Sequence, residues 1–216
     1  MTGAAPEGIA PQSAVAPRQW KSSAKIRQSI VDAAREQFSA IGYEQTSIQD
    51  IVDSSGVSVG SIYHHVGGKA AIFTAVATDV IHEQAEASRR AIATALAEEE
   101  HTGLELYLIG ARAYLMASWR NRRVTGAILG DDRPAGFDRV EESLMERMAA
   151  GTRDITLGQP PTPSASARAV TALLRAAAEE LVGIEDQASA ESVVSYFLQL
   201  LRRLAQDTGP WGHLPP

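Results

Sequence analysis

The chain of 216 residues contains no cysteine. Disulfides, thiolate metal sites and cysteine nucleophiles are therefore excluded. No apolar run approaches the roughly 18 residues that a membrane-spanning helix needs, and the N-terminus lacks the basic start and apolar core of a signal peptide. We therefore expect a cytoplasmic protein that has no membrane partner.

The sequence also lacks the short motifs of common enzymes. We find neither a glycine-rich phosphate loop nor a nucleophile-elbow motif. The segment His82-Glu83-Gln84-Ala85-Glu86 offers an imidazole and a carboxylate at a spacing that can bind metal. A second histidine is missing, however, and mixed charge on a long helix is usually a solvated face. We expect no catalytic activity, no metal and no other cofactor.

An excess of positive charge is absent as well, since the formal net charge is −6. The charge is unevenly distributed. Residues 18–75 hold six basic and five acidic side chains, and the acidic excess lies after residue 75. Because the location of charge matters more than its sum, the acidic total does not exclude a nucleic-acid partner for the N-terminal part.

Helical periodicity is present along most of the chain, and we see no consequential strand pattern. A first helix begins at Ser22 or Ser23 and ends at Gly42, which supplies a left-handed turn. Later helices are predicted at about 46–55, 58–66, 69–100, 103–121, 124–129, 137–152, 164–184 and 189–206. We predict an all-α protein with a disordered tail (1–18), a DNA-binding domain (19–68), a helical effector-binding and dimerisation domain (69–208) and an irregular tail (209–216).

The basis for the DNA-binding domain is the segment from Ile26 to Phe73. Two short helical patterns are joined through Gly56-Val57-Ser58. Thr46-Ser47-Ile48-Gln49 matches a capping box that starts the first of them, and Ser58 caps the second. This is the layout of a helix-turn-helix, whose second helix enters the DNA major groove. The predicted small core of this segment consists of Phe38, Ile48, Ile51, Val57 and Ile62.

The same segment resembles the N-terminal domain of the tetracycline-repressor (TetR) family of transcriptional regulators. The resemblance covers about 50 residues and rests on Ala33-Ala34, Phe38, Gly42-Tyr43, Thr46-Ser47-Ile48, Asp50-Ile51, Gly56-Val57-Ser58, Gly60-Ser61-Ile62-Tyr63 and Lys69. The chain departs from the family pattern at Val66, where Phe is usual, and at Ala70, where Glu is common. Neither departure removes a predicted DNA contact.

The residues predicted to bind DNA lie at helix starts and at the end of the second helix. Hydroxyls and free amides at a helix start can meet a phosphate. An apolar side chain in the first turn of the recognition helix can contact a thymine methyl, and a glycine there permits close approach. The predicted set is Thr46, Ser47, Ser58, Val59, Gly60, Ser61, Tyr63, His64, His65 and Lys69, of which the two histidines are also consistent with plain surface residues.

The first turn of the recognition helix contains no Arg, Gln or Asn. Direct reading of bases by long polar side chains is therefore limited. Arg18, Lys21 and Lys25 could compensate as an arm on the DNA backbone or in the minor groove. A solvated basic tail is an equal alternative for these three residues.

The C-terminal part has no diagnostic motif, and the resemblance implies that it binds a small effector that changes the spacing of two recognition helices. Apolar residues surround the helix predicted at 103–121, which favours burial on all sides. The predicted pocket residues on it are Tyr107, Arg112, Tyr114, Met116 and Trp119. Glu105 and Arg112 lie at one angular position and could pair, line a pocket or face solvent.

The last helix has an apolar face of roughly 200°, wider than the ~100° that one packing partner needs. With the preceding helix it could form a four-helix interface between two chains. The predicted interface residues are Leu174, Leu181, Val194, Phe197 and Leu201. A wide internal core contact is the alternative.

Together these features predict a homodimeric repressor that binds a palindromic double-stranded DNA operator and is released by a small, largely apolar effector. In an alternative reading, the C-terminal domain is a protein-interaction module without a small ligand. A metal-dependent enzyme is the least favoured reading.

Overall fold

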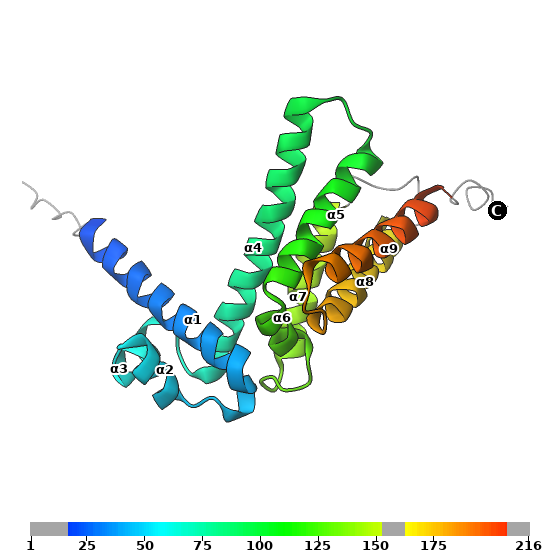
Figure 1. Cartoon of the computed structure of the whole chain (residues 1–216). Helices are drawn as coiled ribbons and strands as arrows, with labels where there is room; N and C mark the ends of the chain where they lie inside the picture. Colours follow the sequence, from blue (N-terminus) through cyan, green and yellow to red (C-terminus); the bar gives the residue numbers. More distant parts are fainter. Residues whose placement is uncertain (1–16, 153–162, 207–216) are drawn as a thin grey trace, which may run out of the picture.

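The computed structural model describes residues 17–152 and 163–206, and every element in these ranges is a helix (Figure 1). The all-α prediction is therefore confirmed for this part of the chain. The helices are α1 (Pro17–Gln45), α2 (Ile48–Ser55), α3 (Val59–His65), α4 (Lys69–Glu98), α5 (Gly103–Arg120), α6 (Arg122–Leu129), α7 (Phe137–Thr152), α8 (Pro163–Val182) and α9 (Gln187–Gln206). The predicted tail before residue 17, the C-terminal tail and the proline-rich loop before α8 lie outside the described residues.

The first helix differs from the prediction at its start. It begins at Pro17, before the Ser22 or Ser23 cap that the sequence suggested. Proline is favoured in the first turn because it has no N–H group to leave unpaired. The helical path is interrupted at Gly42, which has φ 83° and ψ 174°. The positive φ predicted there is confirmed, but the extended ψ is not that of a left-handed helical turn.

The capping box of α2 lies one residue further along than predicted. Ser47, and not Thr46, is the N-cap: its hydroxyl accepts from the Asp50 amide, and the Asp50 carboxylate accepts from the Ser47 amide at 2.7 Å. The Ser47 hydroxyl also donates to the Asp50 carboxylate at 2.7 Å, and these two donations from Ser47 lower the pKa of Asp50. At the other end, Gly56 adopts the left-handed conformation with φ 68°. The turn between α2 and α3 therefore follows directly from the sequence.

The first core is formed where α1, α2 and α3 pack on the start of α4. Phe38, Ile51 and Ile62 are buried in it as predicted, while Ile48 and Val57 are partly buried at its edge. Val66, which replaces the usual Phe, also packs against this cluster without being fully buried. Phe73 lies with its ring centroid 5.3 Å from Phe38 in an edge-on arrangement. This core orients α3 at one end of the molecule.

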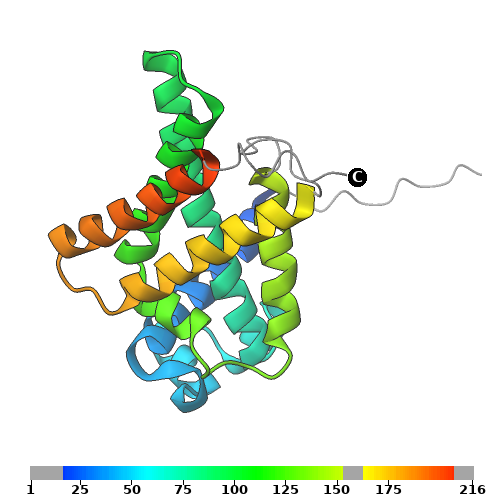
Figure 2. The same ribbon diagram turned by 90° about the vertical axis from the view of Figure 1, so that its right-hand side faces the viewer.

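The second core lies between α5, α8 and α9. The helices α4 and α5 run antiparallel as a long hairpin, and α8 and α9 lie on the side of the molecule away from α3 (Figure 1). Figure 2 shows α8 and α9 crossing the face turned toward the viewer. The prediction that α5 is buried all round holds for most of its length, but Glu105 and Arg112 are exposed. Glu105 completes a capping box with Thr102. Of the three alternatives given for Glu105 and Arg112, the structure therefore supports the one in which both side chains face solvent.

Candidate nucleic-acid interface and internal cavity

The outer face of α3 carries two large side chains that the fold does not cover. Val59 is 42% exposed and Tyr63 is 56% exposed, whereas Ile62 between them is fully buried. Residues four apart lie on the same side of a helix. The helix therefore anchors itself through Ile62 and presents Val59 and Tyr63 outward, together with the exposed Gly60.

Gly60 has no intramolecular reason to be a glycine. A Cβ atom built there would meet nothing within 4 Å, and its φ is not positive. Neighbouring Ser58 caps the helix as predicted, accepting from the Ser61 amide at 3.3 Å and donating to the Ser61 hydroxyl at 3.1 Å. The first turn of α3 is thus an exposed surface of small groups, to which another molecule can come close.

Two of the predicted DNA-binding side chains have intramolecular partners. Thr46 is buried, and its hydroxyl donates to the Gly42 carbonyl at 2.7 Å. Lys69 is half-buried, with its Nζ donating to the Tyr43 carbonyl at 2.7 Å and lying 4.2 Å from the Tyr43 ring centroid. Both residues hold the segment after the Gly42 kink in place. Thr46 has no hydroxyl free for phosphate, so we withdraw it as a direct contact and assign it a positioning role.

The remaining predicted residues lie near the surface. Ser47 and His64 are exposed, and Lys25 on α1 is exposed too. His65 is partly buried, with its Nδ1 3.2 Å from the Ser23 hydroxyl. The side chains of Arg18 and Lys21 lie outside the described residues, so the proposed basic arm stays a prediction.

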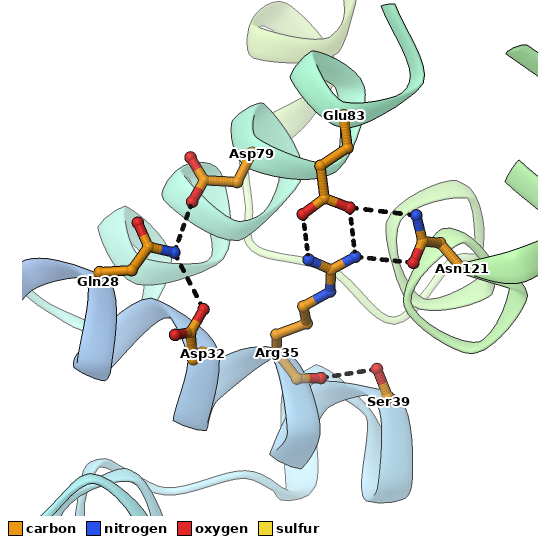
Figure 3. A network of polar contacts seen from close by, with 7 residues as sticks. All are labelled: Gln28, Asp32, Arg35, Ser39, Asp79, Glu83 and Asn121. Carbon is orange, nitrogen blue, oxygen red and sulfur yellow. Dashed lines mark hydrogen bonds and ion pairs between the residues drawn. The ribbon is translucent and has the colours of Figure 1, made fainter. Parts of the chain in front are cut away.

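A polar network joins α1 to the C-terminal helices (Figure 3). The Arg35 guanidinium donates two parallel hydrogen bonds to the Glu83 carboxylate on α4, at 2.6 and 2.8 Å. It also donates to the Asn121 side-chain oxygen at 2.9 Å, and Asn121 donates back to Glu83 at 3.2 Å. The hydrogen bond from Arg35 lowers the pKa of Glu83. Nothing in the sequence indicated this link, because the three residues are far apart along the chain.

An internal cavity lies between α4, α5, α6, α7 and α8. Its volume in this conformation is about 30 Å³, which is room for one or two water molecules. The side chains around it are closely packed in this conformation, so a ligand larger than water would have to move them apart. The lining residues are Val80, Ile81, Gln84, Tyr114, Thr125, Ile128, Leu129, Phe137, Glu141, Thr171, Leu174, Arg175 and Ala178.

One side of this cavity is charged. Glu141 is buried and accepts hydrogen bonds from both Arg133 and Arg175, the first at 2.6 Å. Arg133 also pairs with Asp138 at 3.0 Å, and Arg175 pairs with Glu179 at 2.8 Å. Buried carboxylates need such partners because the loss of water is costly. No sequence pattern indicated this cluster, since its members come from separate helices and the turn before α7.

The five predicted pocket residues do not line one common cavity. Only Tyr114 lines the cavity, and burial raises its pKa to about 12. Tyr107 and Met116 are buried in the second core, the Trp119 indole donates to the Ile184 carbonyl at 2.9 Å, and Arg112 is exposed. Those four are not cavity residues in this structure. Aromatic and apolar character along α5 could not distinguish a cavity wall from core.

The predicted dimer residues also need correction. Leu174, Leu181, Val194 and Leu201 are buried within the chain, because α8 and α9 pack on α5. Leu174 lines the cavity. Among the five, only Phe197 is partly exposed. The uncovered side of α9 instead presents Tyr196, which is 59% exposed, and Leu204, which is 55% exposed.

The geometry of α1 to α3 defines a helix-turn-helix domain, with α3 as its exposed second helix. In comparisons with known proteins, residues 30–76 match the family model described as "Bacterial regulatory proteins, tetR family". Residues 30–76 therefore form a DNA-binding domain of the TetR type, as the sequence resemblance predicted.

A curated relative matches the same part of the chain. It is the HTH-type transcriptional repressor AcnR from Corynebacterium efficiens, which is 37% identical over 60 residues, 28% of this chain and 32% of the relative. The match therefore spans about a third of the relative's length. The rest of the chain lies outside this sequence match.

Solved structures extend the likeness to most of the chain. The fatty acid degradation regulator FadR from Bacillus halodurans superposes with a TM-score of 0.65 at 14% identity, covering 82% of this chain and 94% of FadR. TylP, a TetR regulator from Streptomyces fradiae, gives a TM-score of 0.61 at 20% identity, covering 83% and 85%. At such low identity the likeness shows a shared fold, including the helical C-terminal part.

None of the described helices is both long and apolar enough to cross a membrane.

Proposed function

We propose that the protein is a homodimeric transcriptional repressor that binds a palindromic DNA operator through α3 and is released by a small, largely apolar effector. The observation that carries this proposal is the uncovered face of α3, where Val59 and Tyr63 project beside the bare backbone of Gly60. Repression is supported by the curated relative, which is a repressor.

The contacts proposed for DNA divide into two kinds. Val59, Gly60 and Ser61 would approach base edges in the major groove, where a methyl contact and close backbone approach are the available means of recognition. Ser47, Tyr63 and His64 would contact phosphates, which fix orientation without reading sequence. Lys69 and Thr46 contribute indirectly, because they hold the loop that leads into α2.

The proposed dimer places two copies of α3 at the spacing of two operator half-sites. The exposed side of α9 supports this, since Tyr196, Phe197, Leu200 and Leu204 share one face of the helix and are not fully covered by the chain. Exposed apolar patches of this kind mark association surfaces. We place the boundary between the DNA-binding domain (19–68) and the effector and dimerisation domain (69–208) at the start of α4.

The proposed effector site is the cavity around Tyr114. An effector releases DNA only if it binds better to the conformation whose α3 helices are wrongly spaced. The narrowness of the cavity fits this requirement, because a ligand that widens it would displace helices α4 and α6. Both helices contact α1. The Arg35–Glu83 pair links α4 to α1, and α6 packs directly on α1.

The test is a salt series of binding to a genomic fragment library, followed by footprinting of the retained fragments. A palindromic footprint and a binding constant that falls steeply with salt are expected. A variant carrying Val59→Asp should lose the footprint while keeping its helical circular dichroism. The measurement is repeated after the protein has been denatured, stripped of small molecules and refolded. If binding shows no sequence preference before or after this treatment, the proposal of operator binding is refuted.

A further inference from the structure

We infer that the cavity accepts an uncharged molecule with an apolar body and one amide or other carbonyl head, and that Gln84 binds this head. The inference rests on the proposed function, since it specifies the effector of the site proposed there. It is carried by the unpaired side-chain amide of Gln84, the charges around Glu141 and the composition of the cavity wall.

Gln84 is a buried polar residue that has no partner among the described residues. It is 3% exposed and its side chain lines the cavity. Its amide forms no hydrogen bond with a described residue. A buried amide loses its hydration on folding and normally recovers it through a partner. A glutamine kept at this place, next to Val80 and Ile81, therefore points to a ligand that supplies the partner.

The charged side of the cavity disfavours an ionic ligand. Arg175, the guanidinium that lines the cavity, already pairs with Glu141 and Glu179. Arg133, which also pairs with Glu141, has Asp138 as its second partner. A ligand carboxylate would find no uncompensated cation. A ligand ammonium would find Glu141 occupied on both oxygens by arginines. Burying a charge without a partner is costly, so the head should be neutral.

The chemistry of Gln84 specifies the head further. A side-chain amide offers one donor group and one acceptor side by side. An amide on the ligand can satisfy both through two parallel hydrogen bonds, and a ketone or ester can satisfy the donor. The body must be apolar and small, because most of the remaining lining is aliphatic or aromatic: Val80, Ile81, Ile128, Leu129, Phe137 and Leu174.

The experiment uses three probes with one apolar body: cyclohexanecarboxamide, cyclohexanecarboxylate and cyclohexylmethylammonium. Ligand-observed NMR titrations at pH 7 with the full chain give the affinity of each. We expect the carboxamide to bind at least tenfold more tightly than either ion. Gln84→Leu should weaken carboxamide binding about tenfold, whereas Thr94→Leu, which places a leucine on the exposed side of the same helix, should leave it unchanged.

A second variant keeps the test decisive if Gln84→Leu does not fold. Ala178→Leu fills the cavity from α8 and should also abolish carboxamide binding. The inference is overturned if a charged probe binds more tightly, if the carboxamide does not saturate, or if either cavity variant binds it like the wild type. Operator binding measured on the same samples tests the proposed function separately. If the protein binds the operator but not the carboxamide, this inference is wrong and the proposed DNA binding stands.

Discussion

Individual side chains in this protein often have a role that their type alone does not indicate. Lys69 is a cation in a DNA-binding motif, yet its ammonium group donates hydrogen bonds to the carbonyls of Tyr43 and Glu44. Thr46 has a hydroxyl at a helix start, yet it is buried. Gly60 is the opposite case, since nothing inside the molecule requires a glycine there. Residues whose type is unexplained by the fold are the better indicators of an external partner.

Replacement of Gly60 separates folding from DNA binding. Because a Cβ atom there meets no other group, Gly60→Ala should fold normally and gain up to about 1 kcal/mol in the free energy of unfolding from its higher helix propensity. It should bind the operator at least tenfold more weakly, since the methyl group obstructs close approach to the bases. Urea denaturation and a fluorescence anisotropy titration measure the two effects. Undiminished operator affinity would show that the α3 backbone does not approach DNA closely.

Tyr107 gives a prediction about stability. Its hydroxyl is buried in the second core without a hydrogen-bond partner, and burial raises its pKa. Tyr107→Phe removes the unpaired polar atom and keeps the ring, so the free energy of unfolding should stay equal or rise by about 1 kcal/mol. Urea denaturation at pH 7 provides the measurement. A loss of more than about 1 kcal/mol would mean that the hydroxyl has a partner, such as a bound water.

The helices show how elements are held at defined angles. Four caps set helix ends. Ser47 and Gly56 cap the two ends of α2, Ser58 caps the start of α3, and Thr102 caps the start of α5. The relative placement of α1 and α4 depends on contacts between elements, in particular the pair of Arg35 with Glu83. A displacement of α4 at the cavity would be transmitted to α1 through this pair.

The Arg35–Glu83 pair should make stability depend on pH. The pKa of Glu83 is lowered in the folded state, so its contribution is full above the ordinary carboxylate value of 4.5 and is lost as the pH falls through the lowered value. Glu83→Gln should therefore destabilise the protein by about 0.5 kcal/mol at pH 7, a small figure because the pair is partly exposed. As the pH falls through the lowered pKa of Glu83, the difference from the wild type should vanish.

Denaturation curves at several pH values test this prediction, and Glu98→Gln on the same helix serves as the control. Glu98 is exposed and forms no ion pair with a described residue. Equal pH dependence of the wild type and Glu83→Gln would contradict the expectation that this pair contributes to stability.

At the scale of the whole molecule, the two candidate surfaces lie at opposite sides. The helix α3 is at one end, and α9 lies on the other side of the α4–α5 hairpin (Figure 1). The cavity adjoins α4 and α6, which both pack near α1. A dimer formed through α9 would therefore leave both copies of α3 free to face DNA.

The dimer prediction is tested by charge on the exposed side of α9. Sedimentation of the wild type should give twice the chain mass of 23.0 kDa. The double variant Tyr196→Glu/Leu204→Glu should sediment as a monomer, because it places two carboxylates in an apolar interface. Leu96→Glu is a matched control, since Leu96 is 59% exposed at the far end of α4. A monomeric wild type at micromolar concentration would refute the interface.

The sequence by itself determined the helices and the DNA-binding motif. Caps, glycines and apolar periodicity are local signals, and they located α2 to α9 to within about two residues, with Phe38, Ile51 and Ile62 in the core. Local signals could not determine which apolar side chains are covered by the same chain. Leu174, Leu181, Val194 and Leu201 match a dimer surface in spacing, but packing on α5 buries them.

Tertiary structure also decided the polar sites. Gln84, Glu141 and Arg175 come from three helices, and no spacing along the chain relates them. Arg35, Glu83 and Asn121 likewise meet only after α1 has packed on α4 and α6. The physical reason is that a helical period reports which residues share a face, whereas burial, ion pairing and cavity formation depend on what packs against that face.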